Sequence, residues 1–105
     1  MEKRNIGAHR VTDRDDVAVA VRALERGERI AVEGESSVTA VTVAQDVPLG
    51  HKIALRDIAA GEEVFKYAAP IGRASVSIPE GAHVHTHNLE GIRGRGDKLE
   101  RGAPR

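Results

Sequence analysis

The chain of 105 residues has no cysteine and no tryptophan, and it has one phenylalanine and one tyrosine. The absence of cysteine excludes disulfide bonds, thiolate catalysis and cysteine-ligated zinc sites. The scarcity of aromatic side chains removes the usual stacking platform for single-stranded nucleic acid. The core must therefore be built from valine, isoleucine, leucine and alanine, in a chain whose length suits one domain.

Charge of one sign is not in excess, because 16 lysines and arginines balance 16 aspartates and glutamates. No net field would draw the protein to nucleic acid or to an anionic membrane, and we expect neither as a partner. The charged first residues are not followed by a long apolar run, so neither a signal peptide nor a membrane span is predicted. We therefore expect a cytoplasmic protein.

One segment has the features of an amphipathic helix. Thr12 or Asp13 can cap its start, and acidic residues follow where the positive end of the helix dipole would lie. Gly27 stands where a C-terminal cap is needed. The spacing predicts a single helix over Asp15–Arg26. Its apolar positions are Val17, Ala20, Val21 and Leu24.

The remaining apolar runs are short and rich in β-branched residues. Residues 6–11 could form one strand. Arg29–Val32 and Val38–Val43 flank a polar segment that is typical of a hairpin turn. These runs favour strands over further helices.

Three similar units follow, at residues 46–53, 57–64 and 77–84. Each has an apolar residue, a turn that ends in glycine, two variable residues and the start of an apolar strand. The glycine is expected to adopt a positive φ. Such sharp reversals imply compact β structure, so the predicted fold class is mostly β with one helix, α+β.

The chain divides by composition near residue 90. Residues 91–105 hold four glycines, five basic and two acidic side chains, without apolar periodicity. We predict a folded domain over residues 1–90 and a flexible, basic, glycine-rich tail over residues 91–105.

The segment 81–88 places three of the five histidines two residues apart. In a strand, His83, His85 and His87 would point to the same side, and imidazole is the commonest metal ligand. A straight strand would spread the three rings over about 13 Å, so at most two of them should hold one ion. His85 and His87 are predicted ligands, and His9 or His51 could supply the third. A solvent-exposed row without a ligand is the alternative.

A second polar group is Gly50-His51-Lys52. His51 could transfer a proton or bind a metal, and Lys52 could meet a substrate carboxylate. We predict catalytic roles for His51 and Lys52 and substrate contacts for Lys52, His83 and Asn88. Two alternatives stay open: an ordinary exposed turn at residues 50–52, and an Asn88 that orients a histidine or only ends the strand.

These motifs together resemble the small N-terminal module of the altronate/galactarate dehydratase family. The resemblance spans residues 6–90, and it implies a SAF-type β-clip fold in a module that is either fused to a large catalytic domain or made as a separate small subunit. It rests on His9 and on segments 16–21, 46–61, 66–67, 70–72 and 83–88.

The resemblance also implies a function. Such enzymes are metal-dependent lyases that remove water from hexonate or hexarate sugar acids, and a related pair of subunits eliminates sulfite from sulfolactate. It implies a divalent metal, Fe(II) or Mn(II), a sugar-acid substrate and a large catalytic subunit as partner.

Elimination needs removal of a proton α to a carboxylate and protonation of the leaving group. A small domain is not expected to do all of this, so we expect a small subunit of a hydro-lyase that is inactive alone. A homodimer could cover an exposed apolar patch. The alternatives are a non-enzymatic module that binds a carbohydrate acid or stabilises an oligomer, and a metal-storage domain.

Overall fold

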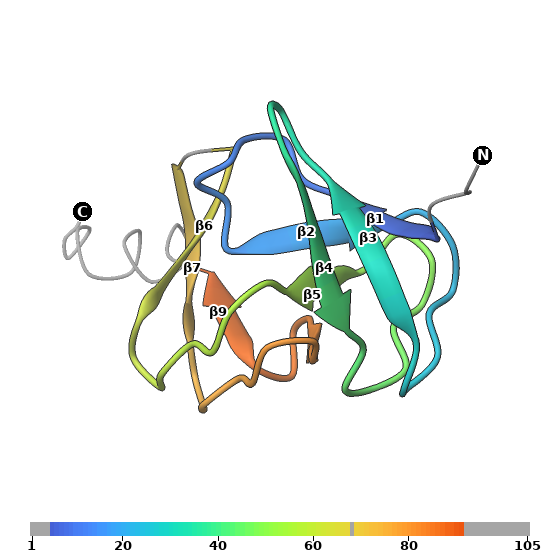
Figure 1. The fold of residues 1–105 in the computed structure, drawn as a ribbon. Coiled ribbons are helices and arrows are strands. Elements are labelled where there is room, and N and C mark those ends of the chain that lie inside the picture. Colours follow the sequence, from blue (N-terminus) through green and yellow to red (C-terminus); the bar gives the residue numbers. More distant parts are fainter. Residues whose placement is uncertain (1–4, 68, 92–105) are drawn as a thin grey trace, which may run out of the picture.

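The computed structural model describes residues 5–67 and 69–91, which contain nine β-strands and no helix (Figure 1). Within this part of the chain, no helix is long and apolar enough to cross a membrane. The predicted tail lies outside the described residues, apart from Gly91. The strands are β1 (Ile6–His9), β2 (Val17–Ala20), β3 (Arg29–Glu33), β4 (Val38–Thr42), β5 (Lys52–Ala54), β6 (Glu63–Lys66), β7 (Ala69–Ala74), β8 (His83–Val84) and β9 (Leu89–Gly91).

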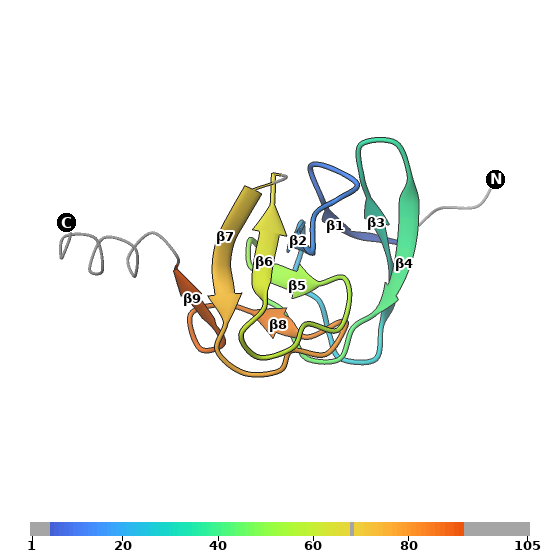
Figure 2. The same ribbon diagram turned by 90° about the vertical axis from the view of Figure 1, so that its left-hand side faces the viewer.

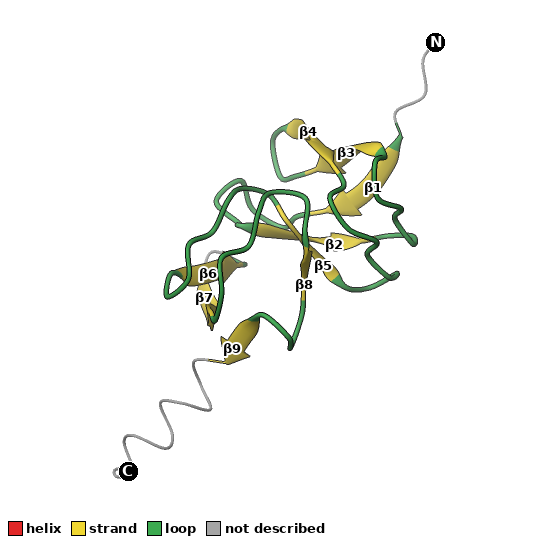
Figure 3. Cartoon of the chain, turned by 90° about the horizontal axis from the view of Figure 1, so that it is seen from below, coloured by secondary structure: helices red, strands yellow, loops and turns green. Residues whose placement is uncertain are grey.

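The strands form two sheets. Six strands make a curled sheet in the order β4-β3-β1-β2-β5-β8, and three make a smaller sheet in the order β6-β7-β9. Neighbouring strands are antiparallel except β1 and β3, which are parallel. Seen from below, β2, β5 and β8 lie between β3 and β4 at one end and the smaller sheet at the other (Figure 3). The predicted mostly-β class and the hairpin of β3 and β4 are confirmed.

The predicted helix over Asp15–Arg26 is wrong. Val17–Ala20 form β2 in the middle of the larger sheet, paired with β1 and β5. Strands buried on both faces read as continuous apolar runs, and periodicity does not separate such a run from a short buried helix. Residues 21–26 then leave the sheet and turn, and Leu24 pairs with Val47 in an isolated bridge.

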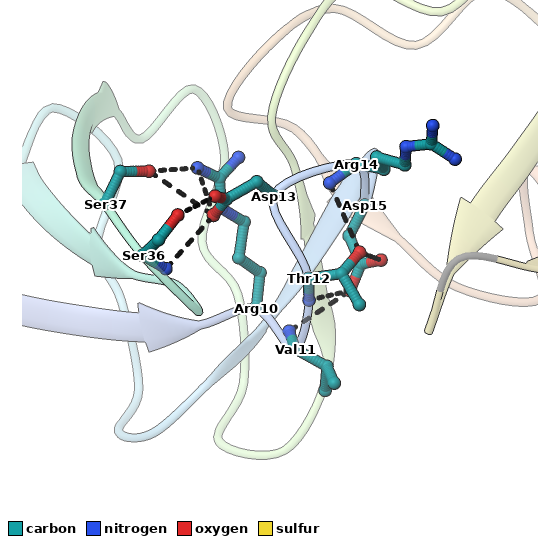
Figure 4. A network of polar contacts seen from close by, with 8 residues as sticks. All are labelled: Arg10, Val11, Thr12, Asp13, Arg14, Asp15, Ser36 and Ser37. Carbon is teal, nitrogen blue, oxygen red and sulfur yellow. Dashed lines mark hydrogen bonds and ion pairs between the residues drawn. The ribbon is translucent and has the colours of Figure 1, made fainter.

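The residues expected to begin the helix instead hold a loop (Figure 4). The carboxylate of Asp15 accepts hydrogen bonds from the backbone amides of Val11 and Thr12 at 3.1 and 3.2 Å, and from the Thr12 hydroxyl at 2.7 Å. Asp13 accepts a hydrogen bond from the Ser36 hydroxyl across the β3–β4 turn. Polar side chains that favour helix starts also favour such local turns, which explains the misleading signal.

Four corners with one pattern, rather than three, shape the fold. In each corner, a buried apolar residue is followed by a four-residue turn with glycine in third place, and a second buried apolar residue stands six positions after the first. All four glycines have φ between 85° and 95°, as a type II turn requires at that place. The corners are corner 1 (Leu24–Ile30), corner 2 (Val47–Ile53), corner 3 (Ile58–Val64) and corner 4 (Ile78–Val84).

The positive φ expected in the three predicted units is confirmed at Gly50, Gly61 and Gly81. Gly27 also has a positive φ, but it belongs to the turn of corner 1 and not to a helix cap. The glycine pattern was therefore a better guide to residues 24–30 than the helical spacing was.

The corners meet in pairs, and each pair has its own core. Leu24 and Val47 join corners 1 and 2 through backbone hydrogen bonds of 2.8 and 2.9 Å, and Ile58 and Ile78 join corners 3 and 4 through two of 2.8 Å. The apolar residues of the first pair lie in one buried cluster and those of the second pair in another. Each such side chain contributes about 1.5–3 kcal/mol when fully buried.

Asp16 ties the smaller sheet to the larger one. Its carboxylate accepts hydrogen bonds from Arg56 Nε at 2.8 Å and from the Phe65 amide at 2.9 Å. Its own amide donates to the Phe65 carbonyl at 2.8 Å. This link fixes β6 against the start of β2 and so sets the relative position of the two sheets.

Corner 4 offers a test of the fold. A Cβ on Gly81 would collide with the carbonyl oxygen of Thr42, whereas a Cβ on Gly27 would meet nothing within 4 Å. We expect Gly27→Ala to lower the free energy of unfolding by about 1–2 kcal/mol through backbone strain alone. Gly81→Ala should cost about 1–3 kcal/mol more. Urea unfolding followed by circular dichroism measures both, and equal losses would contradict the packing described for corner 4.

Candidate histidine site

The pairing of β5 with β8 brings histidines from two distant corners together. Corner 2 leads into β5 and corner 4 into β8, with Lys52 opposite Val84 and Ile53 opposite His83. His51 immediately precedes β5 and His85 immediately follows β8, so the same register sets them opposite one another. Their rings stack with centroids 4.1 Å apart and planes 17° apart.

His83 completes a compact group. Its Nε2 lies 2.9 Å from His51 Nδ1, and its ring centroid is 5.6 Å from that of His85. One ring nitrogen from each of His51, His83 and His85 lies within 4.8 Å of the other two. We call these three half-buried residues the histidine cluster.

The predicted row of histidines turns sooner than expected. β8 ends at Val84, and His85–Asn88 form a turn in which the amides of Asn88 and Leu89 donate to the His85 carbonyl at 3.1 and 3.0 Å. His87 lies in this turn and is exposed, with its ring centroid 5.2 Å from that of His83. It therefore stands at the margin of the cluster.

His9 and Lys52 fall on either side of β2. His9 ends β1, is exposed and pairs with Val19, while Lys52 pairs with Val19 from the other strand. Among the described residues, the side chains that could share one ion are those of the histidine cluster, and His9 is not one of them. Of the two candidates for a third ligand, the structure brings His51 to His83 and His85.

Asn88 is buried, and its side-chain amide forms hydrogen bonds with backbone groups of the cluster. Its Oδ1 accepts a hydrogen bond from the His85 amide and its Nδ2 donates to the His83 carbonyl, each at 2.9 Å. This arrangement fixes the backbone on both sides of Val84. These bonds agree with the open alternative in which Asn88 orients a histidine, and a substrate contact for Asn88 stays a prediction.

Sequence reasoning missed Gln45, whose side-chain oxygen accepts a hydrogen bond from the His83 amide at 3.0 Å. Its place relative to the corners gives the signal that could have found it. Gln45 stands two residues before corner 2, and arginines stand at the corresponding position before corners 1 and 3.

In corners 1 and 3, a glutamate caps the turn and forms a salt bridge with an arginine, and corners 2 and 4 lack this glutamate. Glu28 accepts a hydrogen bond from the backbone amide of Glu25 at 2.7 Å and pairs with Arg22 at 3.0 Å. In corner 3, Glu62 accepts from the Ala59 amide at 2.7 Å and pairs with Arg56 at 3.1 Å.

His51 takes the glutamate's place in corner 2, and Ala82 takes it in corner 4. Corners 2 and 4 therefore lack the salt-bridged glutamate that caps the turn in corners 1 and 3. Residues that break a local rule without a stabilising gain are candidates for function.

The electrostatics favour neutral imidazoles. Burial lowers the pKa of His83 and of His85, and the charge of His51 lowers both pKa values further. A neutral imidazole keeps a lone pair for a metal ion or a proton. Burial also lowers the pKa of the Lys52 ammonium, and repulsion from the charge of Lys66 lowers it further.

These directions give a prediction for the chain kept free of metal by a chelator. The pKa values of His83 and His85, followed by NMR, should lie below the ordinary value of about 6.5. His51→Gln should raise both, because it removes a neighbouring charge. In the parent chain the lowered pKa values mean that the folded state binds fewer protons than the unfolded state. The free energy of unfolding of the parent should therefore fall as the pH drops below about 6.5. Ordinary pKa values, or no response to His51→Gln, would contradict the cluster.

Comparison with known proteins adds an independent finding. Residues 7–91 match the profile of the altronate/galactarate dehydratase SAF domain. Altronate dehydratase of Escherichia coli (strain K12) is 49% identical over 74 residues, which are 70% of this chain and 14% of that protein. Altronate dehydratase of Bacillus subtilis (strain 168) is 39% identical over 81 residues, 77% of this chain and 16% of that protein.

A third relative is similar in size to this chain. The subunit alpha of (2R)-sulfolactate sulfo-lyase from Chromohalobacter salexigens is 39% identical over 84 residues, which are 76% of this chain and 89% of that subunit. The chain thus spans a small part of the two dehydratases and most of the length of the sulfo-lyase subunit.

Proposed function

This chain belongs to the altronate/galactarate dehydratase SAF-domain family, and on that premise we propose that it is the small, non-self-sufficient component of a lyase that acts on hydroxy acids. The observation that carries the proposal is the meeting of His51, His83 and His85 at one place, within 4.8 Å by their ring nitrogens. The chain offers this cluster to an active site that a larger component completes.

The relatives share one kind of chemistry. Altronate and sulfolactate are both 2-hydroxy carboxylates, and the enzymes named for them are a dehydratase and a sulfo-lyase. Each substrate carries a group on the carbon next to the hydroxyl-bearing one that leaves as water or sulfite. We infer that this chain serves an elimination of the same type, with a sugar acid or a related hydroxy acid as substrate.

The need for a larger partner follows from the demands of that reaction. A base must take the proton α to the carboxylate, and an acid must protonate a hydroxide as it leaves. The cluster provides imidazoles and Lys52 provides an ammonium, but these lie on the surface of a small domain. The matched regions make up 14% and 16% of the two dehydratases, which leaves most of each protein for the rest of the site.

The donor set suits a divalent transition metal. Two nitrogens bound to one ion at about 2.0–2.1 Å lie about 3 Å apart or slightly more. The 2.9 Å between His51 Nδ1 and His83 Nε2 is close to that spacing. Imidazoles favour iron or zinc over manganese, so of the two expected metals Fe(II) fits better than Mn(II). When bound, such an ion would supply positive charge that offsets the negative charge developed as the proton α to the carboxylate is removed.

Each residue then has a distinct part. His51, His83 and His85 form the ligand set, in place of His85 and His87 with a third ligand from His9 or His51. Lys52 meets the substrate carboxylate, and Asn88 and Gln45 hold the backbone of His83 and His85. Proton transfer by His51, which shares a hydrogen bond with His83 when no ion is bound, stays the alternative to its role as a ligand. The β-clip arrangement and a cytoplasmic location belong to the same proposal.

A chimera tests the proposal. We expect Escherichia coli altronate dehydratase to keep dehydrating altronate when its matched segment is replaced by residues 7–91 of this chain. In the chimera, His51→Ala or His85→Ala should each lower kcat/KM at least about 100-fold, since even residues that only support metal ligands change activity 10–100-fold. His9→Ala is the matched control and should change it less than about threefold.

Two results would contradict the proposal. One is turnover of altronate or sulfolactate by the isolated chain, which would make the partner unnecessary. The other is a folded chimera that is inactive, or that is indifferent to the cluster substitutions. The latter would favour a module that binds a carbohydrate acid or joins copies of itself.

A further inference from the structure

Strand β4 is the last strand at one edge of the larger sheet. It pairs with β3 on its inner side, and within residues 5–67 and 69–91 no strand pairs with its outer side (Figure 2). An unpaired edge of this kind presents backbone amides and carbonyls to which a further strand can bind. The outer side of β4 is therefore a candidate surface for association.

Backbone hydrogen bonds show which residues of β4 face outwards. The Ser37 carbonyl accepts from the Gly34 amide at 2.9 Å, and the Val43 amide donates at 2.8 Å to the carbonyl of the residue that precedes β3. Residues of an antiparallel strand direct their backbone groups to its two sides in alternation. Because Ser37 and Val43 direct theirs towards β3, the even-numbered residues between them, including Val38 and Ala40, direct theirs outwards.

The free part of this edge is short and is bounded at both ends. Next to the β3–β4 turn, the Ser36 amide donates to the Asp13 carboxylate at 3.5 Å. At the other end, the Ala44 amide donates to the Gly81 carbonyl at 2.8 Å, and Gly81 lies against the Thr42 carbonyl. The outward backbone groups between these two ends form no hydrogen bond with another described residue.

The sequence of β4 lacks the features that keep edge strands unpaired. Such strands are usually protected by lysine, proline, a bulge or inward-pointing charge. Val38–Thr42 contains no charged residue and no proline, its register with β3 is regular, and Val38 is 43% exposed. By contrast, the edge strands of the smaller sheet carry charges, Glu63 and Lys66 on β6 and Glu90 on β9.

We propose that this edge pairs with the same edge of a second copy of the chain, antiparallel and about a two-fold axis at Thr39. Val38 then lies opposite Ala40 of the second copy, and Ala40 lies opposite Val38 of the second copy. Each of these pairs exchanges two hydrogen bonds, so the outward amides and carbonyls of both residues find partners. The proposal goes beyond the lyase component, and it gives the homodimer expected from the sequence a definite interface.

The two bounded ends fix this register. If the second strand slid by two residues in one direction, the pairing would need the Thr42 carbonyl, against which Gly81 lies. If it slid by two residues in the other direction, the pairing would need the Ser36 amide, which Asp13 already holds. A slip by one residue would oppose outward groups with groups that bind β3.

The side chains at the seam suit two identical strands. Val38 meets Ala40 and Thr39 meets Thr39, so no charges of the same sign face one another. A seam of residues 38–40 from each copy buries less than about 1,200 Å², so we expect a weak and reversible dimer, with a Kd on the order of 0.1 mM. β8 and the histidine cluster lie at the opposite edge of the sheet, so each copy keeps its cluster free for a larger component.

Sedimentation equilibrium of the full chain, from about 10 µM to about 1 mM, measures the Kd of the dimer. Val38→Lys places a charge at the seam, and we expect it to raise this Kd about tenfold. Val76→Lys is the matched control, because Val76 is 52% exposed and lies outside the strands. It should leave the Kd unchanged.

A second variant changes the backbone in place of the side chain. Ala40→Pro removes an amide that faces outwards and is not used by β3, and edge strands tolerate proline at such positions. Two hydrogen bonds of the dimer are lost, so the Kd should rise about tenfold or more. Circular dichroism checks that the variant keeps its fold.

Cross-linking tests the register, because the chain has no cysteine of its own. At the two-fold axis, the two copies of Thr39 form a pair without hydrogen bonds between them, with Cα atoms about 4.5 Å apart, which a disulfide can span. Thr39→Cys should therefore oxidise to a covalent dimer, seen on a non-reducing gel. Ala40→Cys and the control Val76→Cys should cross-link several-fold more slowly.

The interface is overturned if the chain stays monomeric at about 1 mM, which would leave the edge for a strand of a different protein. It is also overturned if a dimer forms whose Kd ignores both Val38→Lys and Ala40→Pro. Faster cross-linking at Ala40→Cys than at Thr39→Cys would overturn the register. None of these measurements uses a metal or a substrate, so they leave the lyase proposal to be judged by the chimera.

Discussion

The antiparallel pairing of β5 with β8 is the constraint on which the site depends. It joins corner 2 to corner 4, which are about 30 residues apart in the chain, and its register sets His51 against His85. Two side chains outside the ladder also hold the backbone of His83, whose amide donates to the Gln45 side-chain oxygen and whose carbonyl accepts from the Asn88 side-chain amide. A shift of one residue would turn the histidines of one strand to the opposite face.

The four corners divide the work of the domain. Corners 1 and 3 carry a glutamate that caps the turn and pairs with an arginine, and they serve the scaffold. Corners 2 and 4 lack that pair and supply the histidines instead. Corner 1 pairs with corner 2 and corner 3 with corner 4, so each pair contains one corner with a glutamate cap and one corner that supplies histidines. In each pair the capped corner supports the corner that supplies histidines. A small domain can thus expose a group of imidazoles while its two apolar clusters stay closed.

Much of this could be predicted from local sequence. The hairpin of β3 and β4 and the positive φ of Gly50, Gly61 and Gly81 follow from β-branched runs and turn chemistry, which are local properties. The helix over Asp15–Arg26 was predicted wrongly because the apolar run of β2 is buried on both faces, and the corner beginning at Leu24 continues the same apolar spacing. Comparison of residues 24–30 with the three predicted units, which have the same glycine pattern, would have identified that corner.

The composition of the site depends on contacts that no local pattern contains. His83 and His85 were expected on one side of a strand, but the choice of His51 over His9 depends on which strands pair. β5 lies next to β8, whereas β1 is separated from β8 by β2 and β5. The role of Asn88 likewise depends on a turn at His85–Asn88 that an uninterrupted strand would not form.

The most direct test of the account is a crystal structure of the chain soaked with Zn(II), located by its anomalous scattering. The account predicts one strong anomalous peak between the rings, bound by one nitrogen each of His51, His83 and His85 at about 2.0–2.1 Å. An ion bound by His87 or His9 without His51, or rings of His51 and His85 on opposite faces of the sheet, would contradict it.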